Sequence, residues 1–301
     1  MSEFKTARSM SDVEYKEFNE EMNRLSNIQW KGYAKTLKEI GISYLGAVGH
    51  SAKMAHSVEH HFDTYCVYLS AYNLSGLQVC NEQYSKNCKE NCLVSSGQYR
   101  LSEHAKENRV KKSRNTKSRL FFVNRDVFMR LFCYELEKYK KIAEKNGNLF
   151  SVRINATSDL SPELFIVPDT DQNIIQYYND VQFYDYCKVI PRIEKLHNKY
   201  PNYFMVYSYD GSQMSKEFAL KYLEMGGHVA VVFATTKTDN LPKKWCGYDV
   251  CNGDLYDYRP IDPAPICGLA FKITATSVKN GKFTMPNTDF IVKLDSPDCV
   301  K

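Results

Sequence analysis

The sequence predicts an α/β fold built on mostly parallel strands. Short apolar runs rich in β-branched and aromatic residues alternate with segments of helical period, which is typical of parallel sheets with right-handed crossovers. Several runs end in polar side chains, as strands do where they reach a functional edge. The chain has 301 residues, 43% of them hydrophobic, which is enough to bury such a core. We therefore expect a partial, TIM-like (β/α) barrel with an N-terminal helical extension.

Changes of pattern along the chain predict three parts. They are an N-terminal helical extension (1–62), a (β/α) barrel-like domain with a cysteine loop and a basic helix (63–276), and a C-terminal tail (277–301). Residues 11–40 have a mixed-charge helical pattern, and Ser11 followed by Glu14 fits a capping box. His56 and His60 lie four residues apart, a spacing that can bind a metal. A surface or capping cluster is the simpler explanation, since no H-E-x-x-H pattern is present.

The elements of the barrel-like domain follow from local composition. Apolar runs bounded by turn residues predict strands at 64–71, 149–159, 181–188, 203–210, 228–236 and 267–275, and the last of these is expected to be the final strand. Helical patterns occur at 98–119, 125–147 and 215–227. In the second helix, Gly147 suits the position just past the end. Its apolar residues at helical spacing are expected in the core: Phe128, Met129, Phe132 and Leu136.

Composition excludes several classes of protein. The net charge of +5 permits an anionic partner without requiring one, and a charged share of 25% is ordinary for a globular chain. No run reaches the ~18 to 20 apolar residues of a membrane span, and the first residues lack the apolar region of a secretory signal. We therefore expect a cytoplasmic protein with no membrane partner and with its ten cysteines reduced.

Three cysteines are crowded into one polar stretch, where Cys80, Cys88 and Cys92 read C-x7-C-x3-C. In a reducing compartment such a loop is more often a metal site than a disulfide. Structural zinc takes four ligands, and no obvious fourth lies nearby. Thiolates also hold a [4Fe–4S] cluster, and three of them would leave one iron open to a small chelating ligand. Iron–sulfur is therefore preferred over zinc. Because the loop follows strand 64–71, we expect it at the carboxyl ends of the strands.

Polar side chains close three predicted strands and are candidate site residues. They are Asn155, Thr157, Ser158 and Asp159 after the second strand, Asp185 and Lys188 in the third, and Ser208 and Asp210 at the end of the fourth. The carboxyl ends of parallel strands meet at one edge, so these side chains could act together on a ligand. A helix cap by Asp159 and salt bridges within the chain are the structural alternatives.

Two further polar segments have open interpretations. The segment NGDLYDYRPIDP contains Asp254, Asp257, Arg259 and Asp262. It could recognise substrate or form an ion pair that shapes the site, and a turn rich in Asp and Pro explains it equally well. The basic run at 109–119 is most simply a solvated helix face. Clusters of Lys and Arg also give nonspecific affinity for nucleic acid or clamp an anion.

Seven segments occur in an order that resembles a known family. They are YLSAYNLSGLQVC, NCKENCLVSSG, RNTKSRLFFVNRDVF, VRINATSD, VQFYDYCK, GGHVAVVF and NGDLYDYRPIDP with CGLAFK, and together they cover residues 65–275. On these motifs the chain is similar to an uncharacterised family of phage and plasmid proteins, the gene product 88-like family. Because Arg114, Lys117 and Arg119 match family positions, they are the basic residues expected to contact nucleic acid or another anion.

The chain departs from the family pattern at five positions. Asn81, Asn87, Ala156, Cys187 and Tyr256 stand where the family has proline, glycine, glycine, threonine and histidine. None of these changes removes a thiol from the loop. The missing histidine at 256 argues against any mechanism that needs an imidazole there.

The family is similar in turn, by analogy, to proteins with a three-cysteine loop on a radical S-adenosylmethionine (SAM) barrel. This likeness implies a [4Fe–4S] cluster on Cys80, Cys88 and Cys92 whose open iron binds SAM, although the usual spacing there is C-x3-C-x2-C. The strand-end side chains would then hold SAM and an unknown substrate. A phage context favours a nucleotide or nucleic acid as that substrate, and the host cytoplasm as the location. Catalysis would also need an electron donor.

Two other functions remain open at this point. One is a non-catalytic, metal-stapled nucleic-acid-binding phage protein, in which the thiols are structural and the basic helix is the working surface. The other is a metal-dependent hydrolase that uses the strand-end aspartates.

Overall fold

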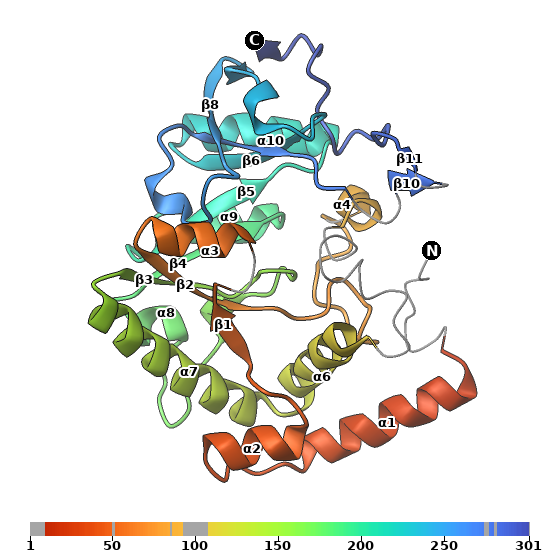
Figure 1. The fold of residues 1–301 in the computed structure, drawn as a ribbon, viewed down its shortest axis with the longest axis vertical. Helices are drawn as coiled ribbons and strands as arrows, with labels where there is room; N and C mark the ends of the chain where they lie inside the picture. Colours follow the sequence, from red (N-terminus) through yellow and green to blue (C-terminus); the bar gives the residue numbers. More distant parts are fainter. Residues whose placement is uncertain are drawn as a thin grey trace.

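A single large sheet with helices packed against both faces organises the chain (Figure 1). The computed structural model describes residues 10–49, 52–84, 86–92, 108–273, 277–279 and 282–300. Among these residues, no helix combines the length and the apolar character that crossing a membrane requires.

The sheet has ten strands and is mostly parallel. In spatial order they are β1 (Gly46–Val48), β2 (Phe62–Val67), β3 (Leu149–Arg153), β4 (Gln182–Cys187), β5 (Tyr203–Ser208), β6 (His228–Phe233), β9 (Ile266–Ala270), β8 (Tyr248–Asn252), β7 (Lys244–Trp245) and β12 (Cys299–Val300). Neighbours from β2 to β8 pair in parallel, while β1, β7 and β12 pair antiparallel at the two edges. In the described chain the two edges do not pair with each other, so the sheet is open. The predicted α/β class with mostly parallel strands is confirmed.

Helices connect most of the parallel strands. They are α1 (Asp12–Ser26), α2 (Tyr33–Ile40), α3 (Ala52–Glu59), α4 (Lys86–Glu90), α6 (Arg109–Val123), α7 (Arg125–Asn146), α8 (Ile174–Tyr177), α9 (Ile190–Leu196) and α10 (Gln213–Glu224). Short 3₁₀ turns occur at η3 (Pro162–Leu164), η4 (Thr238–Asn240) and η5 (Arg259–Ile261). A separate two-stranded ribbon, β10 (Val278–Lys279) with β11 (Lys282–Phe283), precedes the C-terminal segment.

All six predicted strands are present, each shorter than its apolar run. The run at 149–159 ends as a strand at Arg153, because the following polar side chains fold back onto the sheet edge instead of continuing the ladder. The prediction that 267–275 holds the final strand is wrong, since β12 pairs with β7 beyond it. Strands of two or three residues such as β1, β7 and β12 carry no alternating pattern that a sequence window could detect.

The helix predictions were right in kind and partly wrong in extent. The expected capping box of Ser11 and Glu14 begins α1, but the helical pattern at 11–40 is broken into α1 and α2, with Gly32 at a φ of 86° before the second helix. Helix α7 ends where expected, with Gly147 in the left-handed conformation at a φ of 71°. Of the predicted basic helix at 98–119, the described part begins with α6, and residues 98–107 lie outside the described residues.

The first face of the sheet carries Tyr65, Val152 and Phe183 and holds the main apolar core. Helix α7 packs on it, and the Phe132 ring meets the Tyr65 ring edge-on with centroids 5.5 Å apart. The residues expected in the core from their spacing on this helix are all buried: Phe128, Met129, Phe132 and Leu136. Burial of such side chains typically contributes about 1.5 to 3 kcal/mol each.

One buried carboxylate joins α7 to the amino-terminal segments. Glu135 is fully buried and accepts hydrogen bonds from the backbone N–H groups of Leu45 and Gly46, each at 2.7 Å, and from the hydroxyls of Tyr65 and Tyr33 at 2.7 and 2.8 Å. Four donors satisfy a charge that would otherwise be costly to bury. The carboxylate thereby fixes β1 beside β2.

The predicted extension (1–62) and tail (277–301) both contribute to the sheet and its core. Leu25, Leu37 and Ile40 from α1 and α2 are buried in the main core, and β1 pairs with β2. Near the other end, Val292 forms a parallel bridge with Phe233 at the end of β6.

The second face of the sheet carries Cys66, Arg153 and Tyr186. Over the amino-terminal half of this face lie α3 and the segment that contains η5. The Tyr258 ring stacks on Phe62 at 4.6 Å, and the backbone N–H of Asp257 donates to the Ser57 hydroxyl at 2.8 Å. This half of the second face is therefore closed by protein.

Candidate functional site

The structure places the predicted strand-end residues along three adjacent parallel strands, β3, β4 and β5. The segment Asn155–Asp159 follows β3, Lys188 follows β4, and Asp210 follows β5. These residues therefore lie at the carboxyl edge of the sheet. Most of their polar atoms contact one another or the neighbouring backbone.

Asp185 is the centre of a buried hydrogen-bond network on the first face. Its carboxylate accepts from the Asn155 backbone N–H at 3.0 Å and side-chain amide at 3.1 Å, and from the Tyr203 hydroxyl at 3.1 Å. The Ser158 hydroxyl donates to the Asn155 amide oxygen at 2.8 Å. Burial raises the pKa of Asp185 to about 6, even though the Arg192 charge lowers it. The network fixes the turn after β3.

Arg192 on α9 is a site residue that the sequence patterns missed. Its guanidinium donates to Asp159 at 3.1 Å and to Glu163 at 3.2 Å, and it also contacts the Tyr203 hydroxyl. The second Asp159 oxygen accepts from the Lys188 backbone N–H at 2.8 Å. The predicted alternative of ion pairing within the chain therefore describes Asp159 well.

Lys188 reaches across the edge from β4 to β5. Its ammonium donates to the backbone carbonyl of Ser208 at 3.2 Å and contacts the Ser208 hydroxyl. It also lies 5.5 Å from the centroid of the Phe290 ring. Asp210 accepts from the Ser212 backbone N–H at 2.9 Å in the turn before α10. This part of the edge thus combines a positive charge with an apolar wall.

The cysteine loop that follows β2 is attached to this same edge. The backbone N–H of Asp159 donates to the Val79 carbonyl at 2.9 Å, and the Thr157 hydroxyl donates to the Leu69 carbonyl at 2.6 Å. Asn87 on α4 donates to the Asp210 carbonyl at 3.1 Å. The loop is therefore tied to the segments that follow β3 and β5.

None of the ten cysteines, all of which lie within the described residues, forms a disulfide, and the three of the loop are each partly buried. Burial raises the pKa of Cys80, and the charges of Asp159, Cys92 and Cys88 raise it further, so the other two thiols lie within electrostatic range. Cys88 packs against the cluster of Phe271, Phe290 and Ile291, whereas Cys92 packs beside Ala71, Leu74 and Val110. Within the described residues, no three His, Cys, Asp or Glu side chains form a group that could hold a metal ion.

Two of the three basic residues expected to contact an anion are used inside the fold. Lys117 is buried, with its ammonium 4.4 Å from the centroid of the Tyr44 ring, and burial lowers its pKa to about 8. Arg119 forms an ion pair with Glu21 and donates to the Ser75 carbonyl at 3.0 Å. The Arg114 guanidinium lies 5.3 Å from the centroid of the Tyr68 ring. Contact of these residues with nucleic acid stays a prediction.

The segment NGDLYDYRPIDP forms a buried ion-pair cluster on the second face. Asp257 accepts from Arg153 at 2.8 Å and from the Tyr184 hydroxyl at 2.9 Å, and the Lys53 ammonium lies 3.6 Å away. Burial would raise the pKa of Asp257, but the charges of Arg153 and Lys53 hold it at about 2. The structure thus brings together Lys53 and Arg153, which the sequence patterns did not single out.

Arg259 completes this cluster and is fully buried. It pairs with Asp262 at 3.1 Å and donates to the Cys267 sulfur at 2.8 Å. A Cβ on Gly253 would lie 2.2 Å from that sulfur, so only glycine fits there. Asp254 pairs with Lys272 at 3.2 Å. His56, the other early candidate, lies on the exposed side of α3 beside Glu59 at 3.0 Å.

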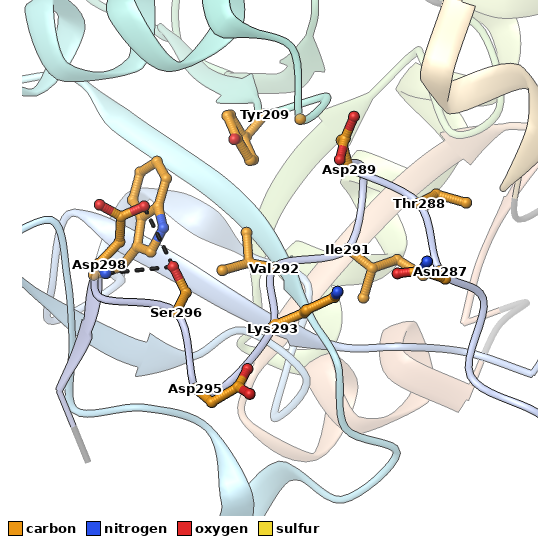
Figure 2. A pocket seen from close by; sticks show the side chains of 12 residues that line it. Tyr209, Asn287, Thr288, Asp289, Ile291, Val292, Lys293, Asp295, Ser296 and Asp298 are labelled. Carbon is orange, nitrogen blue, oxygen red and sulfur yellow. Dashed lines mark hydrogen bonds between the residues drawn. The ribbon is translucent and has the colours of Figure 1, made fainter.

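A pocket of about 360 Å³ lies beyond the ends of β5 and β6 (Figure 2). Tyr209 and Trp245 form part of its wall, and most of the rest comes from the C-terminal segment 287–298. Three carboxylates line it, although Asp298 is paired with Lys216 at 2.6 Å. The Trp245 indole N–H is buried and has no acceptor among the described residues.

Comparison with known proteins identifies a family. No curated protein and no solved structure matches the chain. The family model described as Gene product 88 matches residues 25–282, which is most of the chain. The match begins at residue 25, well before residue 65 where the motif resemblance begins, and so includes much of the predicted extension. The chain therefore belongs to the Gene product 88 family, as its motifs predicted.

Proposed function

We propose that this chain is an iron–sulfur protein that resembles radical SAM enzymes, with a [4Fe–4S] cluster on Cys80, Cys88 and Cys92. The observation that carries the proposal is the position of the cysteine loop. It follows the first parallel strand, β2, and is hydrogen-bonded to the segments after β3 and β5 at the carboxyl edge. Ligand sites of parallel α/β proteins lie at this edge.

The fold supports the proposal at a coarse level. Strands β2, β3, β4, β5, β6 and β9 are consecutive parallel neighbours in an open sheet. We propose that they correspond to a partial (β/α) barrel whose inner side is the second face. The polar and charged side chains on that face are consistent with an inner surface that meets a ligand.

The thiols are of the kind that holds an iron–sulfur cluster, although their sulfur atoms do not converge in this structure. Three cysteines come from one loop, and their charges interact. Since the described side chains form no ready metal-holding group, the sulfur atoms would have to converge when iron is loaded. If bound, such a cluster would supply one electron for reductive cleavage of a C–S bond of SAM, and an external donor would have to replace that electron.

The roles of the chain's own residues follow from their contacts. Thr157 holds the start of the cysteine loop through the Leu69 carbonyl, and Asp159 holds its middle through Val79. Lys188 and Ser208 form the polar rim nearest the apolar cluster of Cys88 and Phe290. In the proposed function these residues orient SAM and substrate. The phage family favours a nucleotide or nucleic-acid substrate in the host cytoplasm.

A non-catalytic, metal-stapled nucleic-acid-binding protein is the alternative. The exposed side chains of Arg109, Lys111 and Lys112 at the start of α6 favour it, because a solvated basic surface gives nonspecific affinity for phosphates. The internal contacts of Lys117 and Arg119 leave those two side chains less available for such a surface.

The test is anaerobic production of the full chain, with measurement of iron, acid-labile sulfide and broad absorption near ~400 nm. We expect a cluster in the wild type and its loss in Cys88→Ser. Cys299→Ser is the matched control, because this partly buried thiol lies away from the loop and should leave the iron content unchanged. Addition of SAM and a reductant should then yield 5′-deoxyadenosine.

The outcomes separate the two functions. Colourless protein with stoichiometric zinc and salt-dependent DNA binding would support the alternative. Iron content in Cys88→Ser equal to that of the wild type would show that the ligand assignment is wrong.

A further inference from the structure

Two buried hydrogen-bond donors on neighbouring strands of the second face have no acceptor among the described residues. They are the Arg153 Nε–H at the end of β3 and the Tyr186 hydroxyl near the end of β4, both buried and unpartnered among the described residues. The two side chains are in contact, since the Arg153 Cζ lies 4.5 Å from the centroid of the Tyr186 ring. Buried donors are nearly always satisfied, and a pair of unsatisfied ones in contact is costly to keep.

The orientation of Arg153 is fixed by its other contact. Its Nη1 donates to Asp257 at 2.8 Å, which occupies one corner of the guanidinium. The unpartnered Nε–H lies on the other edge, where Nε and Nη2 together form the paired hydrogen bonds typical of arginine with oxyanions. The Nε–H is therefore presented in a defined position.

The local charge favours an anion. Arg153 and Lys53 share one carboxylate, that of Asp257. Arg259 pairs separately with Asp262. Burial raises the pKa of Tyr186 well above its ordinary value, so its hydroxyl remains a donor at neutral pH. An anionic acceptor would balance the charge and satisfy both donors.

The two donor atoms are shielded from solvent, although parts of both side chains are exposed. Tyr184 and Arg259, nearer the amino-terminal ends of the strands, are buried, whereas the Arg153 side chain is 17% exposed and Tyr186 is half-buried. Ser208, close to the carboxyl edge on the same face, is also half-buried.

We propose that Arg153 and Tyr186 bind one oxyanion group, a carboxylate or a phosphate, of a small-molecule ligand. The site uses the Nε edge of Arg153 and the Tyr186 hydroxyl. This site needs no bound metal, so anion binding can be tested independently of the proposed iron–sulfur cluster.

The test measures anion binding to the purified, iron-free full chain. Inorganic phosphate and acetate are titrated separately by calorimetry at constant ionic strength, with chloride as the balancing salt, so that the two kinds of oxyanion are distinguished. We expect at least one of them to bind and to raise the melting temperature. Tyr186→Phe should weaken that binding about tenfold, because it removes one hydrogen bond to a charged group.

Tyr186→Phe should also leave the free chain as stable as the wild type or more stable, since the Tyr186 hydroxyl has no hydrogen-bond partner in the described part of the chain. Tyr184→Phe is the matched control on the same strand and face. It removes a satisfied bond to Asp257, so it should lower the melting temperature of the free chain and keep the anion affinity. Absence of binding by both anions, or unchanged affinity in Tyr186→Phe, would overturn the proposal.

Discussion

Glu135 on α7 accepts a hydrogen bond at 2.7 Å from the hydroxyl of Tyr65 on β2, and both side chains are fully buried. The same carboxylate binds the backbone of Leu45 and Gly46, so one side chain connects a helix, a strand and the segment that forms the sheet edge. The amino-terminal segments therefore depend on a charge located ninety residues later in the chain.

Glu135→Gln should lower the free energy of unfolding by about 2 to 4 kcal/mol, because an amide nitrogen would then face donors that now meet a carboxylate oxygen. Urea unfolding followed by circular dichroism measures the change. Glu137→Gln on the exposed side of the same helix is the control and should change stability by less than about 0.5 kcal/mol. Equal stability of the two variants would contradict the central role of Glu135.

The stability of the protein should fall in acid through Asp257. Its folded pKa of about 2 lies below the ordinary value of 3.8. The stabilisation is therefore fully present above the ordinary pKa and is lost as the pH falls toward 2. Its size is about 2 kcal/mol from the difference in pKa. Unfolding free energies measured from pH 4 down to pH 2 should show this slope, because the raised pKa values of Asp185 and Asp262 act between about pH 4 and 6.

Asp257→Asn should remove most of that slope and should lower stability at neutral pH, because Arg153 and Lys53 would lose their carboxylate partner. Asp249→Asn, at an exposed carboxylate beside Lys244, is the control and should keep the slope. A slope that persists in Asp257→Asn would assign the acid sensitivity to other groups.

The buried ammonium of Lys117 should destabilise the fold at neutral pH. Burial is the largest influence on its pKa, which lies at about 8, below the ordinary 10.5, despite the nearby Glu135 charge. The cost is present below about pH 8 and disappears as the pH rises past the ordinary pKa. Lys117→Met should therefore raise stability at pH 7 by about 1 to 3 kcal/mol, and the gain should shrink near pH 10.

Lys111→Met, at an exposed position of the same helix, serves as the comparison for Lys117→Met. It should leave stability almost unchanged at both pH values. A loss of stability in Lys117→Met would mean that its attraction to Glu135 outweighs the burial of its charge.

Gly253→Ala should destabilise the second-face cluster, because the added Cβ would lie 2.2 Å from the Cys267 sulfur and 2.9 Å from Arg259 Nη1. Overpacking of this kind costs about 1 to 3 kcal/mol or more. Adding Cys267→Ala to the same chain should recover part of the loss in a double-mutant cycle of thermal unfolding. Additive effects of the two changes would show that the two residues do not touch.

Much of the secondary structure could be predicted because its signals are local. Helix α7 has an Asn124 cap at its start, a buried apolar stripe and Gly147 at its end, all within one stretch of sequence. Six of the seven strands that pair in parallel are apolar runs between turn residues: β2, β3, β4, β5, β6 and β9. The edge strands β1, β7 and β12 could not be found this way, since a strand of two or three residues exists only because a neighbour offers it hydrogen bonds.

The candidate site was predictable in its location more than in its contacts. Because β3, β4 and β5 are parallel neighbours, the polar residues at their ends necessarily lie at the same edge of the sheet. The hydrogen-bond partner of each side chain could not be predicted from the sequence. Arg192 contacts Asp159 from the separate helix α9, and Arg153 contacts Asp257, which lies 104 residues later in the chain.

The sequence by itself thus determined six of the parallel strands, the longer helices, the family of the chain and the three-cysteine loop. Only the tertiary structure shows that Lys117 is buried and that Glu135 binds the backbone of the segment that forms the sheet edge. It also shows that Arg153 donates to Asp257 while its Nε–H has no acceptor among the described residues. The physical reason is the distance along the chain over which each kind of interaction acts. Propensity, capping and periodicity act within one or two turns of the chain, whereas charge pairing and burial depend on which distant segments the folded sheet brings together.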